Sequence, residues 1–81
     1  MQGSELEALI RAGIPDAEVI VKGEGDHFEA IVISGQFAGR SMVQQHQLVY
    51  GTLGDRFGGE LHALALHTYT PDDWASQRRI Q

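Results

Sequence analysis

The stretch LHALALHTYTPDDW, residues 61 to 74, decides how this chain folds, because it joins an apolar strand directly to a helix start. In a strand over residues 61 to 68, successive side chains point to opposite faces of the sheet. Neither of the two sets of side chains is strongly polar, as expected for a strand covered on at least one face. Thr70 is suited to cap the following helix and Pro71 to its first position, while Trp74 can fold back onto the domain. The stretch therefore predicts a strand over residues 61 to 68 and a short helix from Pro71.

His62 is near the start of this predicted strand and is a candidate metal ligand. A histidine at a strand end is more often a structural residue whose ring nitrogens are hydrogen-bonded, and this segment alone favours that interpretation. The residues in the rest of the chain make a ligand role for His62 the favoured interpretation.

Length and composition limit what the domain can do. A chain of 81 residues forms one small domain that buries about 60% of the surface its unfolded form exposes. Because the chain has no cysteine, it has no disulfide, no thiol nucleophile and no thiolate with which to hold an iron–sulfur cluster unaided. Any metal must be held through His, Asp or Glu.

The charge balance is acidic, with 11 acidic and 6 basic residues and a net charge of −5. This balance opposes non-specific binding to nucleic acid unless the bases gather on one face, and they do not cluster in the sequence. The residues after Met1 form no targeting segment, and no apolar run reaches membrane-spanning length. We expect a cytoplasmic protein that does not associate with a membrane.

Working outward from residues 61 to 74, the pattern predicts a helix over residues 4 to 12 and strands over residues 17 to 22 and 27 to 34. Ser4 and Glu7 have the spacing of a capping box for the helix. The turn chemistry of Gly23-Glu24-Gly25-Asp26 joins the two strands into a β-hairpin.

The middle of the chain predicts helix after a short loop. Residues 42 to 57 carry apolar side chains at helical spacing, although Gly51 and Gly54 are expected to divide them into a helix and a second, shorter one. In the preceding loop, Phe37 is expected to pack under the sheet. The predicted order is α-β-β-α-α-β-α, a single α/β (α+β) domain of residues 1 to 81 with a three-stranded mixed sheet and a flexible tail from about residue 76.

This order of elements has a consequence for the histidines. A strand joined to the next by a helical crossover usually lies parallel to it, so the second and third strands start at the same end of the sheet. His27 opens one and His62 the other, and their backbones are expected roughly 5 Å apart if the strands are neighbours. Two imidazoles make half a metal site, so the remaining ligands must come from water, a small thiol or another chain.

Three segments resemble the BolA-like proteins, and most closely their short IbaG-type bacterial branch. They are GEGDHFEAIVIS (23 to 34), FAGRSMVQQHQLVYGTL (37 to 53) and LHALALHTYTPDDW (61 to 74), which together cover almost the whole chain. The resemblance implies a single α/β domain similar to a type II KH domain, in agreement with the predicted element order.

The resemblance also implies a function. BolA-like proteins pair with monothiol glutaredoxins and share a bridged [2Fe-2S] cluster, to which the glutaredoxin and glutathione supply thiolates and the BolA partner a histidine at the position of His62. It implies that this chain is a monomer without a cluster when alone and a heterodimer with its partner. The family's C-terminal segment can face the glutaredoxin, which makes candidate partner-binding residues of Thr70, Pro71, Trp74, Arg78 and Arg79.

The second ligand of the family lies in the hairpin loop, as a cysteine or as a histidine on a longer loop. This chain departs from both types, since it has Glu24 where the cysteine type places its thiol and lacks the longer insertion. His27 is the nearest imidazole and the second choice as ligand, with Glu24 and Asp26 as further loop contributors. Imidazole in place of thiolate raises the potential of a cluster and makes its binding sensitive to protonation.

The alternative function is that of a KH-like, DNA-binding transcriptional regulator of stress or morphology genes. Arg40 and His46 are its candidate contacts. The loop before Arg40 is one residue longer than the GXXG of nucleic-acid-binding KH domains, and Gln45-His46-Gln47 replaces the Arg-His-Arg of many BolA-like proteins, so two phosphate-contacting charges are missing. His46 also lies on the helix's apolar stripe, where a core-edge histidine with a hydrogen-bonded ring nitrogen is expected.

The remaining candidates argue for no further site. His67 falls on the opposite strand face from His62 and is expected at the surface. The serines have no evident paired base and orienting acid, and no phosphate loop or catalytic carboxylate pair stands out. We therefore expect a non-enzyme, and the charge balance favours the glutaredoxin adaptor over the DNA-binding regulator.

Overall fold

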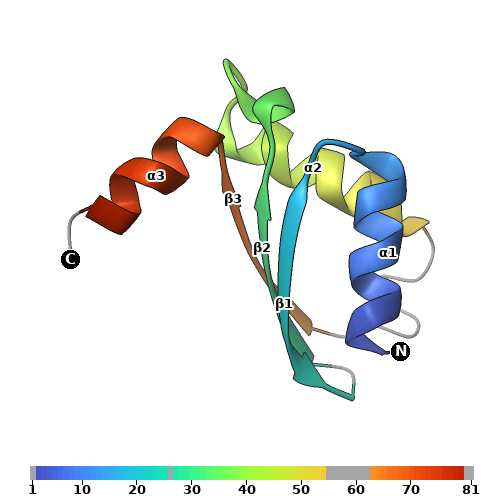
Figure 1. Cartoon of the computed structure of the whole chain (residues 1–81). Helices are drawn as coiled ribbons and strands as arrows, with labels where there is room; N and C mark the ends of the chain where they lie inside the picture. Colours follow the sequence, from blue (N-terminus) through green and yellow to red (C-terminus); the bar gives the residue numbers. More distant parts are fainter. Residues whose placement is uncertain (1, 26, 55–62, 80–81) are drawn as a thin grey trace.

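The computed structural model describes residues 2 to 25, 27 to 54 and 63 to 79. In chain order the elements are α1 (Gly3–Gly13), β1 (Glu18–Glu24), β2 (His27–Ile33), the short 3-10 helix η1 (Gly35–Phe37), α2 (Met42–Leu53), β3 (Ala63–Tyr69) and α3 (Pro71–Arg79). Helices α1 and α2 lie together on one side of the sheet, and α3 projects away from the far end of β3 (Figure 1). Within the described ranges, no helix is both long and apolar enough to cross a membrane.

The sheet is the predicted mixed sheet of three strands, in the order β1-β2-β3. β1 and β2 form the predicted antiparallel hairpin, with Glu24 opposite His27. β2 and β3 are parallel, with His27 opposite Ala63, as the helical crossover between them predicts. This pairing brings the starts of β2 and β3 to one end of the sheet.

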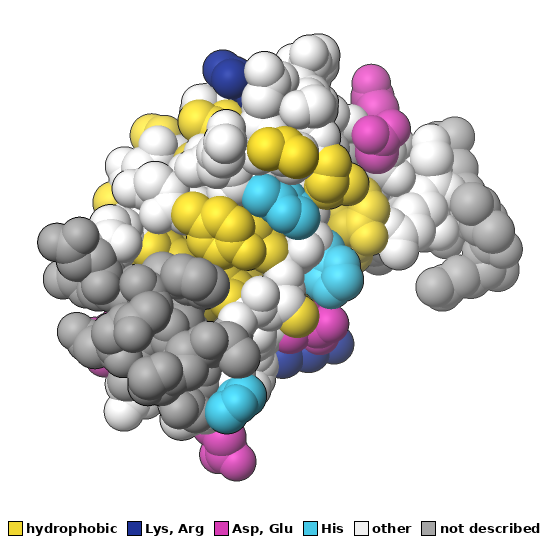
Figure 2. Space-filling model, turned by 180° about the vertical axis from the view of Figure 1, so that it is seen from behind, with side chains coloured by type: hydrophobic (Ala, Val, Ile, Leu, Met, Phe, Trp, Pro, Cys, Tyr) yellow, Lys and Arg dark blue, Asp and Glu magenta, His cyan; other side chains and the backbone are white. Residues whose placement is uncertain are grey.

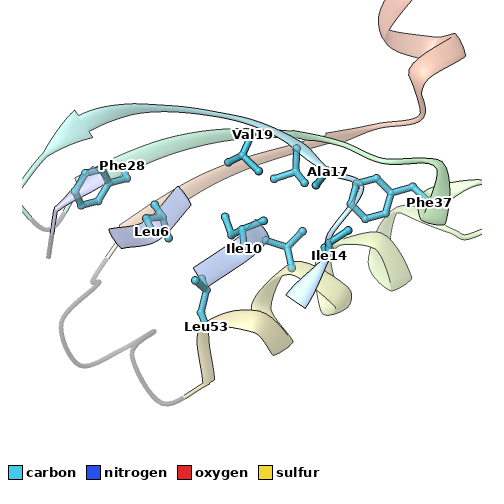
Figure 3. Close-up of a cluster of buried hydrophobic side chains, with 10 residues drawn as sticks. Leu6, Ile10, Ile14, Ala17, Val19, Phe28, Phe37 and Leu53 are labelled. Atoms are coloured by element: carbon cyan, nitrogen blue, oxygen red, sulfur yellow. The ribbon is translucent and has the colours of Figure 1, made fainter. Parts of the chain in front are cut away.

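The core lies between the sheet and helices α1 and α2. Its buried members come from α1, β1, β2, η1, α2 and the segment between α1 and β1: Leu6, Ile10, Ile14, Ala17, Val19, Phe28, Val32, Phe37, Val49 and Leu53 (Figure 3). Leu64 and Leu66 of β3 are partly buried against them. Phe37 is completely buried, which confirms that it packs under the sheet. Because strand side chains alternate between faces, the other face of the sheet carries exposed polar residues, among them Lys22, Glu29 and His67.

Several boundaries differ from the sequence prediction, among them the end of β2 at Ile33 and the end of β3 at Tyr69. Gln2 rather than Ser4 precedes the first turn of α1, and its N–H donates to Oε1 of Glu5 at 3.2 Å. β1 continues past its predicted end to Glu24. It includes Gly23, whose φ of +113° is a conformation in which a Cβ would collide with the His27 carbonyl oxygen. α3 extends to Arg79, so the residues predicted as a tail from about 76 are helical up to that point.

Helix α2 runs unbroken through Gly51, where the sequence predicted a break. A single interior glycine costs a helix only about 1 kcal/mol, which the burial of Val49 and Leu53 outweighs. Gly54, with φ +58°, follows the last residue of the helix, as predicted. The second short helix was predicted to follow Gly54 and to end before Gly58, on residues that lie outside the described part of the chain.

Candidate functional site at the rim of the sheet

His27 is exposed at the first position of β2 and pairs in register with Ala63, the first residue of β3. Ala63 follows His62 directly in the sequence. His62 lies outside the described residues, so its ligand role and its distance from His27 stay predictions. The structure nevertheless brings the chain next to His62 to the rim where His27 stands.

A shallow hollow of about 390 Å³ opens beside this rim, on the sheet face that α1 and α2 leave uncovered. Its lining comes from all three strands: Lys22, Gly23, His27, Phe28, Glu29 and Ala65. The ammonium of Lys22, the carboxylate of Glu29 and the imidazole of His27 therefore surround a partly apolar surface. Such a hollow suits a small ligand that carries both charged and apolar groups.

The donor groups at the rim are too few for a closed metal site. Glu24 is exposed opposite His27, whereas Asp26 lies outside the described residues. Among the residues that are described, no group of three or more His, Cys, Asp or Glu side chains is arranged to hold a metal ion. Since the chain has no cysteine, these donors fit a cluster whose thiolates come from other molecules and do not fit one held by this chain unaided.

His67 lies at the surface, as predicted. Its Nε2 is 3.3 Å from Oε2 of Glu29 on the neighbouring strand, and its side chain is 46% exposed. An ion pair between such exposed groups contributes at most about 1 kcal/mol to stability. We therefore treat His67 as a surface residue outside the rim site.

His46 is half-buried at the edge of the core, but the prediction of a hydrogen-bonded ring nitrogen is wrong for Nε2, which is buried without a partner among the described residues. The nearby polar groups satisfy each other, because Thr68 Oγ1 donates to Gln45 Oε1 at 2.6 Å. The ring instead packs edge-on against Tyr50, with centroids 6.4 Å apart. Met42, predicted on the same apolar stripe, is 58% exposed.

The C-terminal helix has the predicted start. Thr70 Oγ1 accepts a hydrogen bond from Asp73 N–H at 3.2 Å, and Trp74 folds back onto Tyr69, with ring centroids 5.2 Å apart. Pro71 is exposed. The side chains of Arg78 and Arg79 lie outside the described part of the structure, and the partner-binding role of this segment stays a prediction.

The candidate nucleic-acid contacts do not form a basic face in the described structure. Arg40 is exposed and donates through Nε to the Gln36 carbonyl at 2.9 Å. Arg11 pairs with Glu7 on α1, and Lys22 belongs to β1, so these bases stand on separate elements. Gln45 Nε2 donates to the carbonyls of Phe37 and Arg40 at 3.2 and 3.1 Å. These two hydrogen bonds hold the loop before α2 against the helix.

One polar cluster, in which Ser34 is buried and the other members are exposed, escaped the sequence analysis. The carboxylate of Asp16 accepts hydrogen bonds from Ser34 Oγ at 2.8 Å and from Gly35 N–H and Gln36 Nε2 at 3.0 Å each. The Ser34 hydroxyl is the main cause that lowers the pKa of Asp16 below its usual 3.8, against an opposing effect of desolvation. An Asp that follows a proline is typical of a turn, but only the fold brings Ser34 to Asp16.

We expect Asp16→Asn to lower the melting temperature at pH 7, because the amide replaces an acceptor of three hydrogen bonds. The folded pKa of Asp16 lies below its unfolded value of 3.8, so the stabilisation is present above pH 3.8 and is lost as the pH falls through the folded pKa. The difference between wild type and variant should therefore shrink below about pH 3.8. Thermal unfolding followed by circular dichroism from pH 7 to pH 3 tests this, and a difference independent of pH would contradict it.

The fold and the rim define a class: a small α/β domain with an exposed histidine where two parallel strands begin. Comparison with known families agrees, since the model of the family described as BolA-like protein matches residues 10 to 73. The chain belongs to the BolA-like protein family.

Individual relatives place the chain in the family's short, IbaG-type branch. It is 33% identical to acid stress protein IbaG of Escherichia coli K12, over 99% of this chain and 96% of that protein. It is 42% identical to the DNA-binding transcriptional regulator BolA of Vibrio cholerae over 73% of this chain, but over only 56% of that protein. The solved structure of a bolA protein homologue from Coxiella burnetii superposes with a TM-score of 0.83 at 37% identity, covering 93% of this chain and 97% of the other.

Proposed function

We propose that this protein is a non-enzymatic adaptor of the cytoplasm that binds a monothiol glutaredoxin and shares a bridged [2Fe-2S] cluster with it, in iron–sulfur trafficking or iron homeostasis. Membership of the BolA-like family supports the proposal. The observation that carries it is the register of the parallel strands, which sets His27 opposite Ala63, the residue after His62.

In this proposal His62 is the first protein ligand and His27 the second, with Glu24 beside it. The glutaredoxin cysteine and glutathione supply the thiolates that this chain lacks. The exposure of His27 suits ligation to a cluster brought by a partner. Neutral imidazole is the ligating form, so cluster binding is expected to weaken as the histidines become protonated.

The proposed partner surface includes the start of α3, with Thr70, Pro71, Trp74, Arg78 and Arg79. This segment follows Tyr69, at the opposite end of β3 from Ala63. A partner that contacts both ends has to span about 20 Å along β3. A small globular domain, with a diameter of about 30 Å, is large enough to do so.

The proposal is tested by mixing the purified chain anaerobically with a monothiol glutaredoxin, iron, sulfide and glutathione. We expect the isolated chain to form no stable [2Fe-2S] cluster, because it has no thiolate, and the mixture to give a cluster whose absorption and circular dichroism differ from those of the glutaredoxin alone. A coloured, stoichiometric cluster on the chain alone, or an unchanged glutaredoxin spectrum, would overturn the proposal.

A second candidate function, DNA binding, is favoured by the similarity to the DNA-binding transcriptional regulator BolA of Vibrio cholerae. The net charge of −5 opposes it. So does the separation of Arg11 on α1, Lys22 on β1 and Arg40 in the loop before α2. We expect duplex binding at physiological salt to be no tighter than about 10⁻⁶ M. A gel-shift titration measures this, and Gln47→Arg with Gln47→Glu provides a matched pair at an exposed α2 position. Sub-micromolar, sequence-dependent binding by the unmodified chain would favour the regulator instead.

A further inference from the structure

Met42 carries the only sulfur atom in the described part of the chain. The chain has no cysteine, and its other methionine, Met1, lies outside the described residues. The Met42 side chain is 58% exposed at the first position of α2. Peroxides oxidise such thioethers to methionine sulfoxide, a polar group that dedicated reductases convert back to methionine. The sulfur of Met42 is therefore open to this modification.

Although the side chain is exposed, its sulfur has a defined neighbour on the sheet. Sδ of Met42 lies 3.6 Å from Oγ1 of Thr68 on β3. The single hydroxyl proton of Thr68 has a better acceptor, because Oγ1 donates to Gln45 Oε1 at 2.6 Å and a thioether sulfur accepts only weakly. An oxygen atom added to this sulfur therefore needs a different hydrogen-bond donor.

His46 supplies such a donor. It follows Met42 by four residues in α2, so the two side chains lie on the same face of the helix. Figure 2 shows hydrophobic and histidine side chains gathered on one face of the molecule. His46 Nε2 is buried without a partner among the described residues, and a buried polar atom without a partner lowers stability. Both side chains line one groove of about 280 Å³ between α2 and β3, whose full lining is Met42, His46, Leu66, His67, Thr68 and Tyr69.

We propose that Met42 is a site of reversible oxidation whose sulfoxide is held by His46. Hydrogen peroxide transfers one oxygen atom to Sδ: an S–O bond forms, the peroxide O–O bond breaks, the sulfur loses two electrons and the peroxide is reduced to water. The new oxygen accepts a hydrogen bond from Nε2 of His46, in the tautomer that carries its proton there. The three rotatable bonds of the methionine side chain allow the oxygen to turn into the groove.

Oxidation changes the chemistry of an exposed apolar surface. Met42 and the adjacent Val43, which is 66% exposed, are the large hydrophobic side chains that the described structure leaves exposed. A sulfoxide makes the first of them polar, while its hydrogen bond to His46 satisfies an atom that is unpartnered in the reduced protein. The modification thus alters the surface at the start of α2. It involves neither the rim nor a cluster, and it does not rest on the proposed function.

The test treats the full chain, labelled with ¹⁵N, with hydrogen peroxide and follows the oxidation by mass spectrometry. We expect Met42 to oxidise at a rate close to that of free methionine, because its side chain is exposed. In long-range ¹H–¹⁵N spectra the Nε2 resonance of His46 should shift, whereas that of His27 at the rim should not. The two methionine sulfoxide reductases, one for each epimer, should reverse the shift. Met42→Leu, which keeps Met1 as its only oxidisable sulfur, should show no shift at His46.

Variants of His46 separate a held sulfoxide from ordinary surface oxidation. His46→Leu removes the donor and keeps an apolar side chain, whereas His46→Gln restores a donor at the same position. Oxidation should lower the melting temperature of His46→Leu by about 4–8 °C more than that of the wild type, the shift expected for one hydrogen bond in a domain of this size. His46→Gln should behave like the wild type.

The resonance of His46 in the wild type needs no variant, so it decides the question if His46→Leu does not fold. The proposal is overturned if Met42 resists oxidation in the folded chain or if the reductases do not act on its sulfoxide. It is also overturned if the Nε2 resonance of His46 does not move, or if oxidation lowers the melting temperatures of the wild type and of His46→Leu equally.

Discussion

His62→Ala is expected to abolish, or to change strongly, the visible spectrum of the cluster formed with glutaredoxin, while the apo fold stays intact. The reason is that the chain contributes no thiolate, so the loss of one imidazole removes a large part of its hold on the cluster. Absorption and circular dichroism of the reconstituted mixture measure the effect, and far-ultraviolet circular dichroism of the apo variant checks the fold.

Two other histidines serve as internal comparisons. His27→Ala should have a smaller effect on the spectrum, because it is the second choice as ligand. His67→Ala should leave the spectrum unchanged, since His67 is engaged with Glu29 at the surface. If the His62 variant forms the wild-type cluster with unchanged partner affinity, His62 is not a ligand, and the proposed mechanism loses its principal residue.

Gly13→Ala and Gly51→Ala are expected to change stability in opposite directions. At the end of α1, a Cβ on Gly13 would collide with Cγ2 of Thr52 and lie only 2.9 Å from its Cβ, whereas a Cβ on Gly51 meets nothing within 4 Å. We expect Gly13→Ala to lower the free energy of unfolding by about 1–3 kcal/mol, because two packed helices have to separate. Gly51→Ala should raise it by about 0.5–1 kcal/mol, because alanine loses less conformational entropy in a helix.

Urea unfolding of the two variants and the wild type gives the comparison. Both substitutions make the same chemical change in a helix, so the contrast between them isolates the close approach of α1 to α2. Stabilisation by both substitutions would show that Gly13 is not needed for this contact.

Local patterns in the sequence predicted most of the fold. The alternation of residues 27 to 34 and the turn chemistry before them predicted the hairpin, and the helical segment between residues 34 and 61 predicted that β3 lies parallel to β2. These predictions succeeded because periodicity and turn residues act over short distances. The helix break at Gly51 was wrong, because burial of Val49 and Leu53 in the tertiary core overrode a local preference.

By itself, then, the sequence determined the class of the domain, the absence of thiolates and the placement of a histidine at the start of a strand, since these depend on residue types and local spacing. The tertiary structure alone decided the register of His27 opposite Ala63 and the hydrogen bond from Ser34 to Asp16. It also left Nε2 of His46 without a partner among the described residues. These features depend on contacts between residues far apart in the chain, whose pairing is settled by the packing of the whole core.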